Sequence, residues 1–456
     1  MSKSNDELKG YKNAVKEFLK KNDVAIWDVL QIKSKKGEYE GILLPRNELS
    51  PSGYVELKLE NNYNIGINVE DIQSIEKVGR SEAKYKIIEK EFPQKEGFPE
   101  VTLLGTGGTV ASRLDYTTGA VIPAFTPGEL FTAVPELAEV CNLQTEMVFK
   151  ILSENMRPEY WQKLTGKIAK IANSGREGVI IGHGTDTMGF TAAALSFMLK
   201  DLSIPVVLVG SQRSSDRPSS DAAINLINAA VIASTSDIAE VVVSMLGSTS
   251  HDYGLIHRGT LVRKMHSSVR HAFRTLNDIP LGMVKDRKIK MFKKDYRKRE
   301  KKKTIAKTDF EEDVALLHFY PGLKKEQVDF YIDNNYKGLV LAGTGLGHVS
   351  TSLFNSLERA IEENMIVLMT TQTLHGFVDM DVYSTGRELQ QLGIISGKNM
   401  IPEVAYVKMG WVLGQTDNLK KAKELLQTNL AGEIVEREIP IAFNYDIGAL
   451  LKDGKL

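Results

Sequence analysis

Three short segments of this 456-residue sequence combine reactive side chains with glycines that open the backbone to a substrate. The first is LLGTGGTVAS at residues 103–112, which supplies the hydroxyls of Thr106 and Thr109. Glycines let backbone N–H groups approach a substrate closely. A hydroxyl beside such donors provides what acyl transfer needs, a nucleophile and a place for the oxyanion. The spacing fits neither the GxGxxG nor the GxxxxGK phosphate-binding pattern. A plain tight turn with threonine as a helix cap is the alternative for this segment taken alone.

The second segment, GVIIGHGTDTMGFTAAALSFML at residues 178–199, predicts a strand that ends at Gly182 and a helix that follows. Thr185 and Asp186 lie between the two, where ligands bind in open parallel sheets. The alternative is that they only cap the helix, as Thr and Asp commonly do. His183 has no metal-ligand spacing around it and is interpreted as a packed structural histidine.

The third segment, GTLVRKMHSSVRHAF at residues 259–273, contains Lys264 between the apolar residues Val262 and Met265. A partly desolvated lysine can act as a base for a threonine hydroxyl, which ionises too rarely near neutral pH to attack unaided. The alternative is a surface lysine that forms a cationic loop with Arg263. The local sequence alone favours this alternative.

The elements that must position these residues form an α/β pattern from residue 100 onward. Continuous apolar runs that end in Gly, Ser or Thr alternate with helical segments such as TAAALSFMLKDL and DAAINLINAAVIAST. This pattern predicts a parallel sheet covered by helices. We expect one α/β subdomain with the active site at residues 99–284, a basic hairpin and connection at 285–312, and a second α/β subdomain at 313–456. The predicted strands are VTLLG, GVIIGHG, PVVLVGS, EVVVSMLG, GLVLAGTG and MIVLMTTQT.

The first 80 residues read differently. Residues 6–21 place apolar side chains on one stripe of a helix, and several short strands with turn sequences between them follow. They predict a small β-barrel of the SH3 or Sm kind, with a charged linker at residues 81–98. The expected core of this module is Val24, Ile26, Trp27, Val29, Ile42, Leu44, Val55, Ile65, Ile67 and Ile75.

Composition excludes several classes of protein. Lys plus Arg and Asp plus Glu both number 58, so the chain does not bind nucleic acid through bulk positive charge. A single cysteine, Cys141, excludes an internal disulfide framework and an all-cysteine metal site. The polar N-terminus and the lack of an apolar run of membrane-spanning length predict a soluble, cytoplasmic protein without a membrane contact.

Residues 285–303 carry twelve basic and three acidic residues. Alternation in the first half predicts an exposed hairpin strand around Lys288 to Phe292. The second half is interpreted as a solvated connection between two subdomains. The alternative is a contact with RNA phosphates.

Four motifs in this order resemble the asparaginase/glutaminase-type family of amidohydrolases: TGGT at 106–109, HGTDTM at 183–188, GSQR at 210–213 and RKMHSS at 263–268. The resemblance extends over residues 100–440. It implies an asparaginase-like amidase with two α/β subdomains and no metal in the active site.

The resemblance also implies roles for individual residues. Thr106 is the primary nucleophile, and Tyr116 lies in the loop that closes over it. Thr185, Asp186 and Lys264 form a second group that activates a hydroxyl.

Ser153, in ILSENM, is implied to hold the α-carboxylate and α-amino group of the substrate together with Asp186. One departure from the family concerns a glutamate that free bacterial asparaginases supply across a dimer interface. No match is found for it, and near its expected position stand Thr385, Arg387 and Glu388.

A narrower resemblance concerns the D subunits of the archaeal glutamyl-tRNA(Gln) amidotransferase. It rests on the N-terminal module, on RKMHSSVRHAFRTLN and on GRELQQLGIISGKNMIPEVAYVKMGWVLGQT. It implies release of ammonia from L-glutamine for the conversion of Glu-tRNA(Gln) to Gln-tRNA(Gln), without a cofactor in this subunit. The implied partner is an E subunit that uses ATP and Mg²⁺, in a heterotetramer built on a homodimer of this chain. The alternatives are a free-standing L-asparaginase with an extra module and a binding protein that has lost catalysis.

Overall fold

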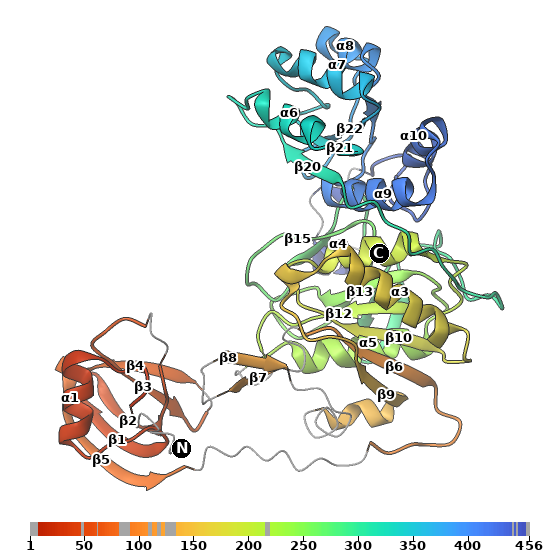
Figure 1. The fold of residues 1–456 in the computed structure, drawn as a ribbon. Coiled ribbons are helices and arrows are strands. Elements are labelled where there is room, and N and C mark those ends of the chain that lie inside the picture. The colour runs from red at the N-terminus through yellow and green to blue at the C-terminus, as the bar shows by residue number, and fades with distance from the viewer. Residues whose placement is uncertain are drawn as a thin grey trace, which may run out of the picture.

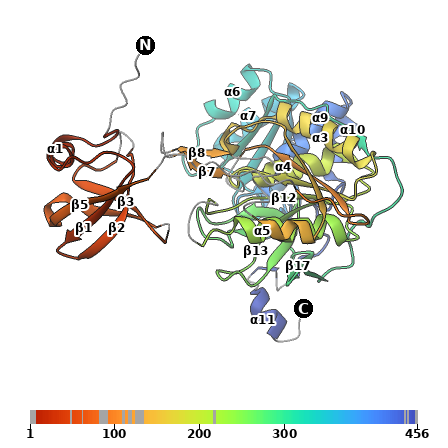
Figure 2. The same cartoon turned by 90° about the horizontal axis from the view of Figure 1, so that it is seen from below.

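The computed structural model divides into an N-terminal β module, a central α/β domain and a C-terminal α/β subdomain (Figure 1). It describes residues 8–46, 50–61, 63–81, 92–107, 112–115, 120–123, 134–214, 219–439, 442–443 and 446–452. In both views the module stands beside the central domain (Figure 2). Among the described residues, no helix has the length and apolar character needed to cross a membrane.

The N-terminal module folds around its own apolar core. Its antiparallel sheet has the order β4-β3-β2-β1-β5, so the last strand returns to pair with the first. The helix begins at Asn13 rather than at residue 6, because Gly10 has a φ of +82° and a Cβ there would lie 1.8 Å from the Arg46 carbonyl oxygen. The elements are α1 (Asn13–Lys21), β1 (Asp28–Ser34), β2 (Gly37–Leu43), β3 (Tyr54–Leu59), β4 (Asn64–Asn68), η1 (Val69–Asp71) and β5 (Ile72–Arg80).

The strands of this module match the predicted ones, but two of them bury the opposite face from the one predicted. Leu30 and Leu43 are fully buried in the core, whereas the predicted core residues Val29 and Ile42 are only partly buried. Side chains alternate between the two faces of a strand, so a shift of one position moves a residue to the other face.

The central domain is built on an eight-stranded sheet in the order β18-β17-β14-β13-β12-β10-β6-β9. The five strands from β13 to β9 are parallel, as predicted, and antiparallel pairs add β14, β17 and β18 at one end. The strands are β6 (Glu100–Gly105), β9 (Asn142–Met147), β10 (Gly178–Gly182), β12 (Val206–Val209), β13 (Val241–Leu246), β14 (Gly254–Arg258), β17 (Gly282–Lys285) and β18 (Lys288–Met291).

Helices cover both faces of this sheet because its central strands are apolar on both sides. Ile180 and Val207 pack with α5 on one face, whereas Ile181 and Leu208 pack with α3 and α4 on the other. Such two-sided burial is typical of parallel sheets. The helices are α3 (Pro158–Ala172), α4 (Met188–Met198), α5 (Ala222–Thr235) and, near the C-terminus, α11 (Ile447–Lys452).

Short elements complete the central domain. The shortest pairs are β7 (Ser112–Asp115) with β8 (Ala120–Pro123), β11 (Leu199–Lys200) with β19 (Ile305–Ala306), and β15 (Val262–Lys264) with β16 (Phe273–Thr275). Single helical turns are η2 (Pro135–Glu139) and η3 (Ser153–Asn155).

The basic stretch forms the predicted hairpin and connection. β17 and β18 pair in the hairpin. In the connection, Arg299 donates hydrogen bonds to the carbonyl oxygens of Ala233 and Ser236 at the end of α5 and to that of Glu177. Part of the positive charge therefore binds the domain's own backbone.

The C-terminal subdomain has a parallel sheet in the order β20-β21-β22-β23. One apolar cluster joins its β21 and α9 to residues of α4, including Phe197 and Met198, so the two α/β units share a core. Its elements are β20 (Val314–His318), α6 (Glu326–Asp333), β21 (Gly338–Gly343), η4 (Thr351–Leu353), α7 (Phe354–Glu362), β22 (Ile366–Thr371), α8 (Ser384–Gln391), β23 (Ile395–Ser396), α9 (Pro402–Gln415) and α10 (Leu419–Gln427).

Candidate active site

Thr106 lies directly after β6, at the carboxyl edge of the central sheet, and its side chain is buried. Its backbone N–H and its hydroxyl both donate to the carbonyl oxygen of Gly182, at 3.1 and 3.0 Å. Gly182 ends the neighbouring strand β10, which runs parallel to β6. Gly107 has a φ of +108°, and a Cβ there would lie 2.1 Å from the Ile151 carbonyl oxygen. Only glycine fits this turn.

Thr185 and Asp186 follow β10 on the same edge of the sheet. Thr185 is buried, whereas the Asp186 side chain is 69% exposed. A Cβ on Gly210, at the end of the adjoining β12, would lie 2.7 Å from the Thr185 methyl group. The absence of a side chain at Gly210 therefore lets Thr185 pack against the neighbouring loop.

Lys264, the last residue of β15, joins this pair. Its Nζ donates to Thr185 Oγ1 at 2.8 Å and to Asp186 Oδ1 at 2.7 Å, and only 13% of its side chain is exposed. The alternative of a surface lysine is therefore wrong. A hydroxyl, a carboxylate and an amine from segments 78 residues apart meet within hydrogen-bond distance.

Ser153 approaches the same edge from η3. It is buried, and its backbone carbonyl accepts a hydrogen bond from Thr187 Oγ1 at 2.7 Å. A Cβ on Gly184 would lie 2.9 Å from Ser153 Oγ. The Ser153 hydroxyl therefore lies against the backbone just before Thr185 and Asp186.

His183 has the structural role that the sequence indicates. Its ring is fully buried between the Gly184 carbonyl oxygen, 2.6 Å from Nδ1, and Thr191 Oγ1, 2.8 Å from Nε2. Burial lowers the pKa of His183 to about 4, so the ring is neutral at physiological pH. It fixes the turn that carries Thr185.

Sequence reasoning missed a carboxylate that shapes the GSQR loop. Asp221 is fully buried, and its two oxygens accept the backbone N–H groups of Gln212 and Arg213 and an amide hydrogen of Asn225. Its position just before α5 was the available signal, because acidic residues commonly precede helices.

Two predicted residues, Tyr116 and Thr109, lie outside the described residues. The residues near the expected cross-interface glutamate belong to α8. Thr385 Oγ1 lies 3.5 Å from His348 Nδ1, and Glu388 is exposed. The structure thus brings together Thr106, Ser153, Thr185, Asp186 and Lys264 at one sheet edge.

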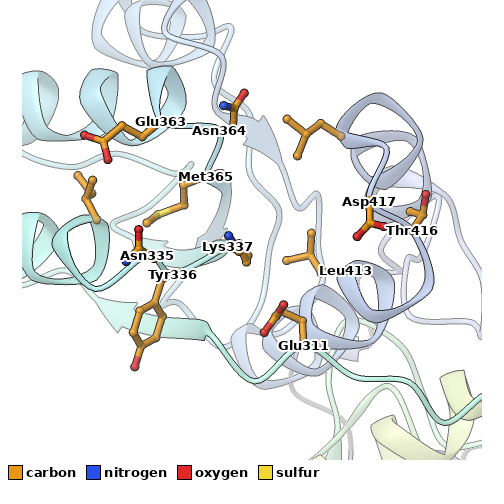
Figure 3. Close-up of a pocket in the computed structure, with 12 residues that line it drawn as sticks. Glu311, Asn335, Tyr336, Lys337, Glu363, Asn364, Met365, Leu413, Thr416 and Asp417 are labelled. Atoms are coloured by element: carbon orange, nitrogen blue, oxygen red, sulfur yellow. The ribbon is translucent and has the colours of Figure 1, made fainter.

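Two cavities can be compared with this edge. One, of about 160 Å³, is lined by Asp186 and Lys264 themselves, together with residues of α4 and α9. A larger cavity of about 320 Å³ lies in the C-terminal subdomain, between charged side chains such as Glu311, Lys337 and Asp417 (Figure 3). It adjoins the residues that precede β21 and β22, and so lies at the amino ends of those strands. Ligands of open α/β sheets bind at the carboxyl ends of the strands. The larger cavity is therefore at the wrong end for such a ligand, whereas the smaller cavity adjoins the reactive side chains of Asp186 and Lys264.

The described residues include no group of three or more His, Cys, Asp or Glu side chains that could hold a metal ion. The reactive groups that the described residues present at this edge are two threonine hydroxyls, a lysine amine and a carboxylate.

Comparison with known proteins agrees with this geometry. Family models match along the chain in three places: the GatD N-terminal domain at residues 24–78, the asparaginase N-terminal domain at 100–297, and the glutaminase/asparaginase C-terminal domain at 313–426. The D subunit of the glutamyl-tRNA(Gln) amidotransferase of Pyrococcus furiosus is 51% identical over 435 residues, which cover 94% of this chain and 99% of that protein. This chain belongs to the D-subunit family of glutamyl-tRNA(Gln) amidotransferases.

Other members of the D-subunit family are similarly related. The protein of Methanopyrus kandleri is 47% identical over 94% of this chain and 95% of its own length. Among solved structures, the thermostable L-asparaginase from Thermococcus kodakarensis is 29% identical, with a TM-score of 0.66 over 74% of this chain and 99% of that one. The asparaginase-like two-subdomain fold predicted from the sequence is therefore confirmed.

Proposed function

We propose that this chain is the ammonia-releasing subunit of a tRNA-dependent amidotransferase. It hydrolyses the side-chain amide of L-glutamine, and the ammonia converts Glu-tRNA(Gln) to Gln-tRNA(Gln). The observation that carries this proposal is the contact of Lys264 with both Thr185 and Asp186, in a chain half identical to named D subunits over nearly their whole length.

Thr106 serves as the nucleophile. Its Oγ1 attacks the amide carbon of glutamine and forms a C–O bond, after which the C–N bond breaks and ammonia leaves with the hydroxyl proton. Water then cleaves the ester, which yields glutamate and restores Thr106. Because the hydroxyl proton points at the Gly182 carbonyl, the oxygen lone pairs are directed elsewhere.

Lys264, Thr185 and Asp186 together supply proton transfer. Once its amine has lost a proton, Lys264 can accept the hydroxyl proton of Thr185, and Thr185 in turn serves as a base for a hydroxyl or water. Asp186 has two tasks, since it contacts Lys264 and presents an exposed carboxylate to the α-ammonium group of the substrate. Ser153 binds the α-carboxylate, and Tyr116 is proposed as a further substrate-binding residue.

The remaining steps belong to a partner. We propose an E subunit that binds Glu-tRNA(Gln) and uses ATP and Mg²⁺, while this subunit needs no cofactor. The complex is a cytoplasmic heterotetramer built on a homodimer of this chain. Exposed apolar side chains in one loop of the C-terminal subdomain (Phe377, Val382 and Tyr383) support an interface there.

An L-asparaginase that works alone is the competing function, since such an enzyme shares the amidase fold. Its solved structure matches about three quarters of this chain, whereas the D-subunit relatives match more than nine tenths. A third possibility, a binding protein without catalysis, conflicts with the assembled Lys264, Thr185 and Asp186.

The test measures ammonia release from glutamine and asparagine, by this chain alone and with its co-purified E subunit and charged tRNA. We expect Gln-tRNA(Gln) to form only in the complex, with glutamine as a donor. Full turnover of asparagine by the isolated chain, with no amidation in the complex, would establish the asparaginase instead.

A further inference from the structure

Helix α9 of the C-terminal subdomain contacts two elements that adjoin the proposed catalytic residues. One is α4, which begins just after the turn with Thr185 and Asp186. The other is β15, which ends with Lys264. α9 and α4 lie together at the junction of the two subdomains (Figure 1), and they share one apolar core.

The contact with α4 is aromatic. The rings of Phe190 on α4 and Tyr406 on α9 meet edge to face, with their centroids 6.3 Å apart. Phe190 is four residues beyond Asp186, so this contact fixes the start of the helix that follows the catalytic turn.

The contact with β15 is ionic. Arg263, the neighbour of Lys264, places a guanidinium nitrogen 3.0 Å from Glu403 Oε1, and the Glu403 side chain is only 16% exposed. Glu403 and Tyr406 are three residues apart and so lie on the same face of α9. Glu403 follows Lys264 by 139 residues in the chain, so no local pattern joins them.

Two features give this ion pair a role in holding the end of β15 that carries Lys264. First, Arg263 stands directly opposite Arg274 in the β15–β16 pair, where like charges destabilise pairing and a carboxylate relieves them. Second, Arg263, Lys264, Glu403 and Asp186 all line the cavity of about 160 Å³ beside the reactive groups. Val262, the first residue of β15, is buried in the central core, whereas Arg263 and Lys264 line the cavity, so apolar packing holds one end of the strand and the ion pair holds the other.

We infer that Glu403 is a positioning residue for the reaction: through Arg263 it holds β15 so that Lys264 reaches Thr185 and Asp186. Helix α9, which carries Glu403, thereby sets the distance between Lys264 and the turn with Thr185 and Asp186. Glu403 is favoured where it stands, since it lies in the first turn of α9, where the helix dipole attracts negative charge. This inference rests on the proposed role of Lys264.

The experiment compares kcat and KM for glutamine, in the complex with the E subunit, for Glu403→Ala, Glu403→Gln, Arg263→Ala and the double variant Glu403→Ala with Arg263→Ala. We expect about a tenfold or larger fall in kcat for each alanine variant, with a smaller change in KM. The double variant should be no worse than either single one, since the two residues act as a pair. Glu403→Gln, which keeps an oxygen that accepts from Arg263, should recover much of the loss.

Two controls separate the possible failures. Glu139→Ala breaks an exposed ion pair with Arg287 on the central domain, and should leave kcat unchanged. Lys264→Met tests the proposed function itself. If Lys264→Met is inactive while Glu403→Ala keeps more than half of the wild-type kcat, the positioning role is refuted and the proposed function stands. Lower thermal stability with unchanged kcat would likewise reduce the pair to a structural tie. An active Lys264→Met would refute the proposed role of Lys264 and, with it, this inference.

Discussion

Acid should destabilise the protein through His183, and the hydrogen bonds around this ring show why. Trp161 Nε1 donates to Thr191 Oγ1 at 3.0 Å, so the Thr191 hydroxyl proton is free to point at His183 Nε2. The other ring nitrogen then donates to the Gly184 carbonyl. This arrangement needs a neutral ring, because a protonated Nε2 would face the hydroxyl proton of Thr191.

The magnitude follows from the pKa of His183, which burial lowers from 6.5 to about 4. Between these pH values the unfolded chain binds one proton more than the folded chain does. The stability contribution is therefore fully present above pH 6.5 and is lost as the pH falls through about 4. The free energy of unfolding falls by on the order of 3 kcal/mol over this pH range, because unfolding takes up one proton.

The assay is urea denaturation at a series of pH values from 7 to 4, for the wild type and for His183→Gln. We expect the free energy of unfolding of the variant to depend less steeply on pH than that of the wild type. The difference in slope should be about 1.4 kcal/mol per pH unit, because the variant lacks the one proton that His183 takes up on unfolding. His257→Gln is a matched control, since burial also lowers the pKa of His257, to about 3. Both variants should flatten the dependence, but only His183→Gln should slow ammonia release, because His183 supports the turn before Thr185. Identical slopes for the wild type and His183→Gln would refute the reasoning.

The other predictions address the proposed chemistry and the module. Thr106→Ala and Thr185→Val should each lower ammonia release on the order of 10³-fold while circular dichroism stays unchanged; a variant that keeps a tenth of the rate disproves its assignment. Lys264→Met should be inactive and Lys264→Arg should not restore activity, because arginine cannot serve as a base; an active arginine variant would mean that only charge matters. Asp186→Asn should raise KM for glutamine at least as much as it lowers kcat; an unchanged KM would assign Asp186 to proton transfer. Deletion of residues 1–81 should leave glutamine hydrolysis intact and impair tRNA amidation, measured side by side; full amidation would leave the module only a shielding role.

The deletion stops at residue 81 because of a residue in the predicted linker. Phe92 packs in the core of the central domain, and the backbone of Lys95 exchanges hydrogen bonds with Asn142. A cut at residue 95, inside the predicted linker, would therefore damage the amidase as well.

Much of the site could be predicted because its residues follow apolar strands directly. Thr106 and Thr185 stand just beyond the glycines that end β6 and β10, and parallel neighbours bring their carboxyl ends together. Lys264 was harder to place, since β15 has only three residues and no periodicity to identify it. Family resemblance, rather than local pattern, assigned it.

Other features could not be predicted for physical reasons. In the N-terminal module, Val29 and Leu30 are both apolar neighbours, as are Ile42 and Leu43, so alternation cannot show which of each pair faces the core. The role of Glu403 depends on a contact between distant parts of the chain, and a single sequence contains no signal for such a contact.

The separate cores described above give the chain two units of cooperativity. The core of the N-terminal module is formed by residues 8–75, whereas the cluster around α4 and α9 draws on both α/β units. Contacts within a shared core are lost together, so the two α/β units stabilise one another and cannot open independently without exposing that core. The module is free of this constraint. Its sequence can change, or its position shift during binding, at little cost to the geometry of Lys264 and its partners.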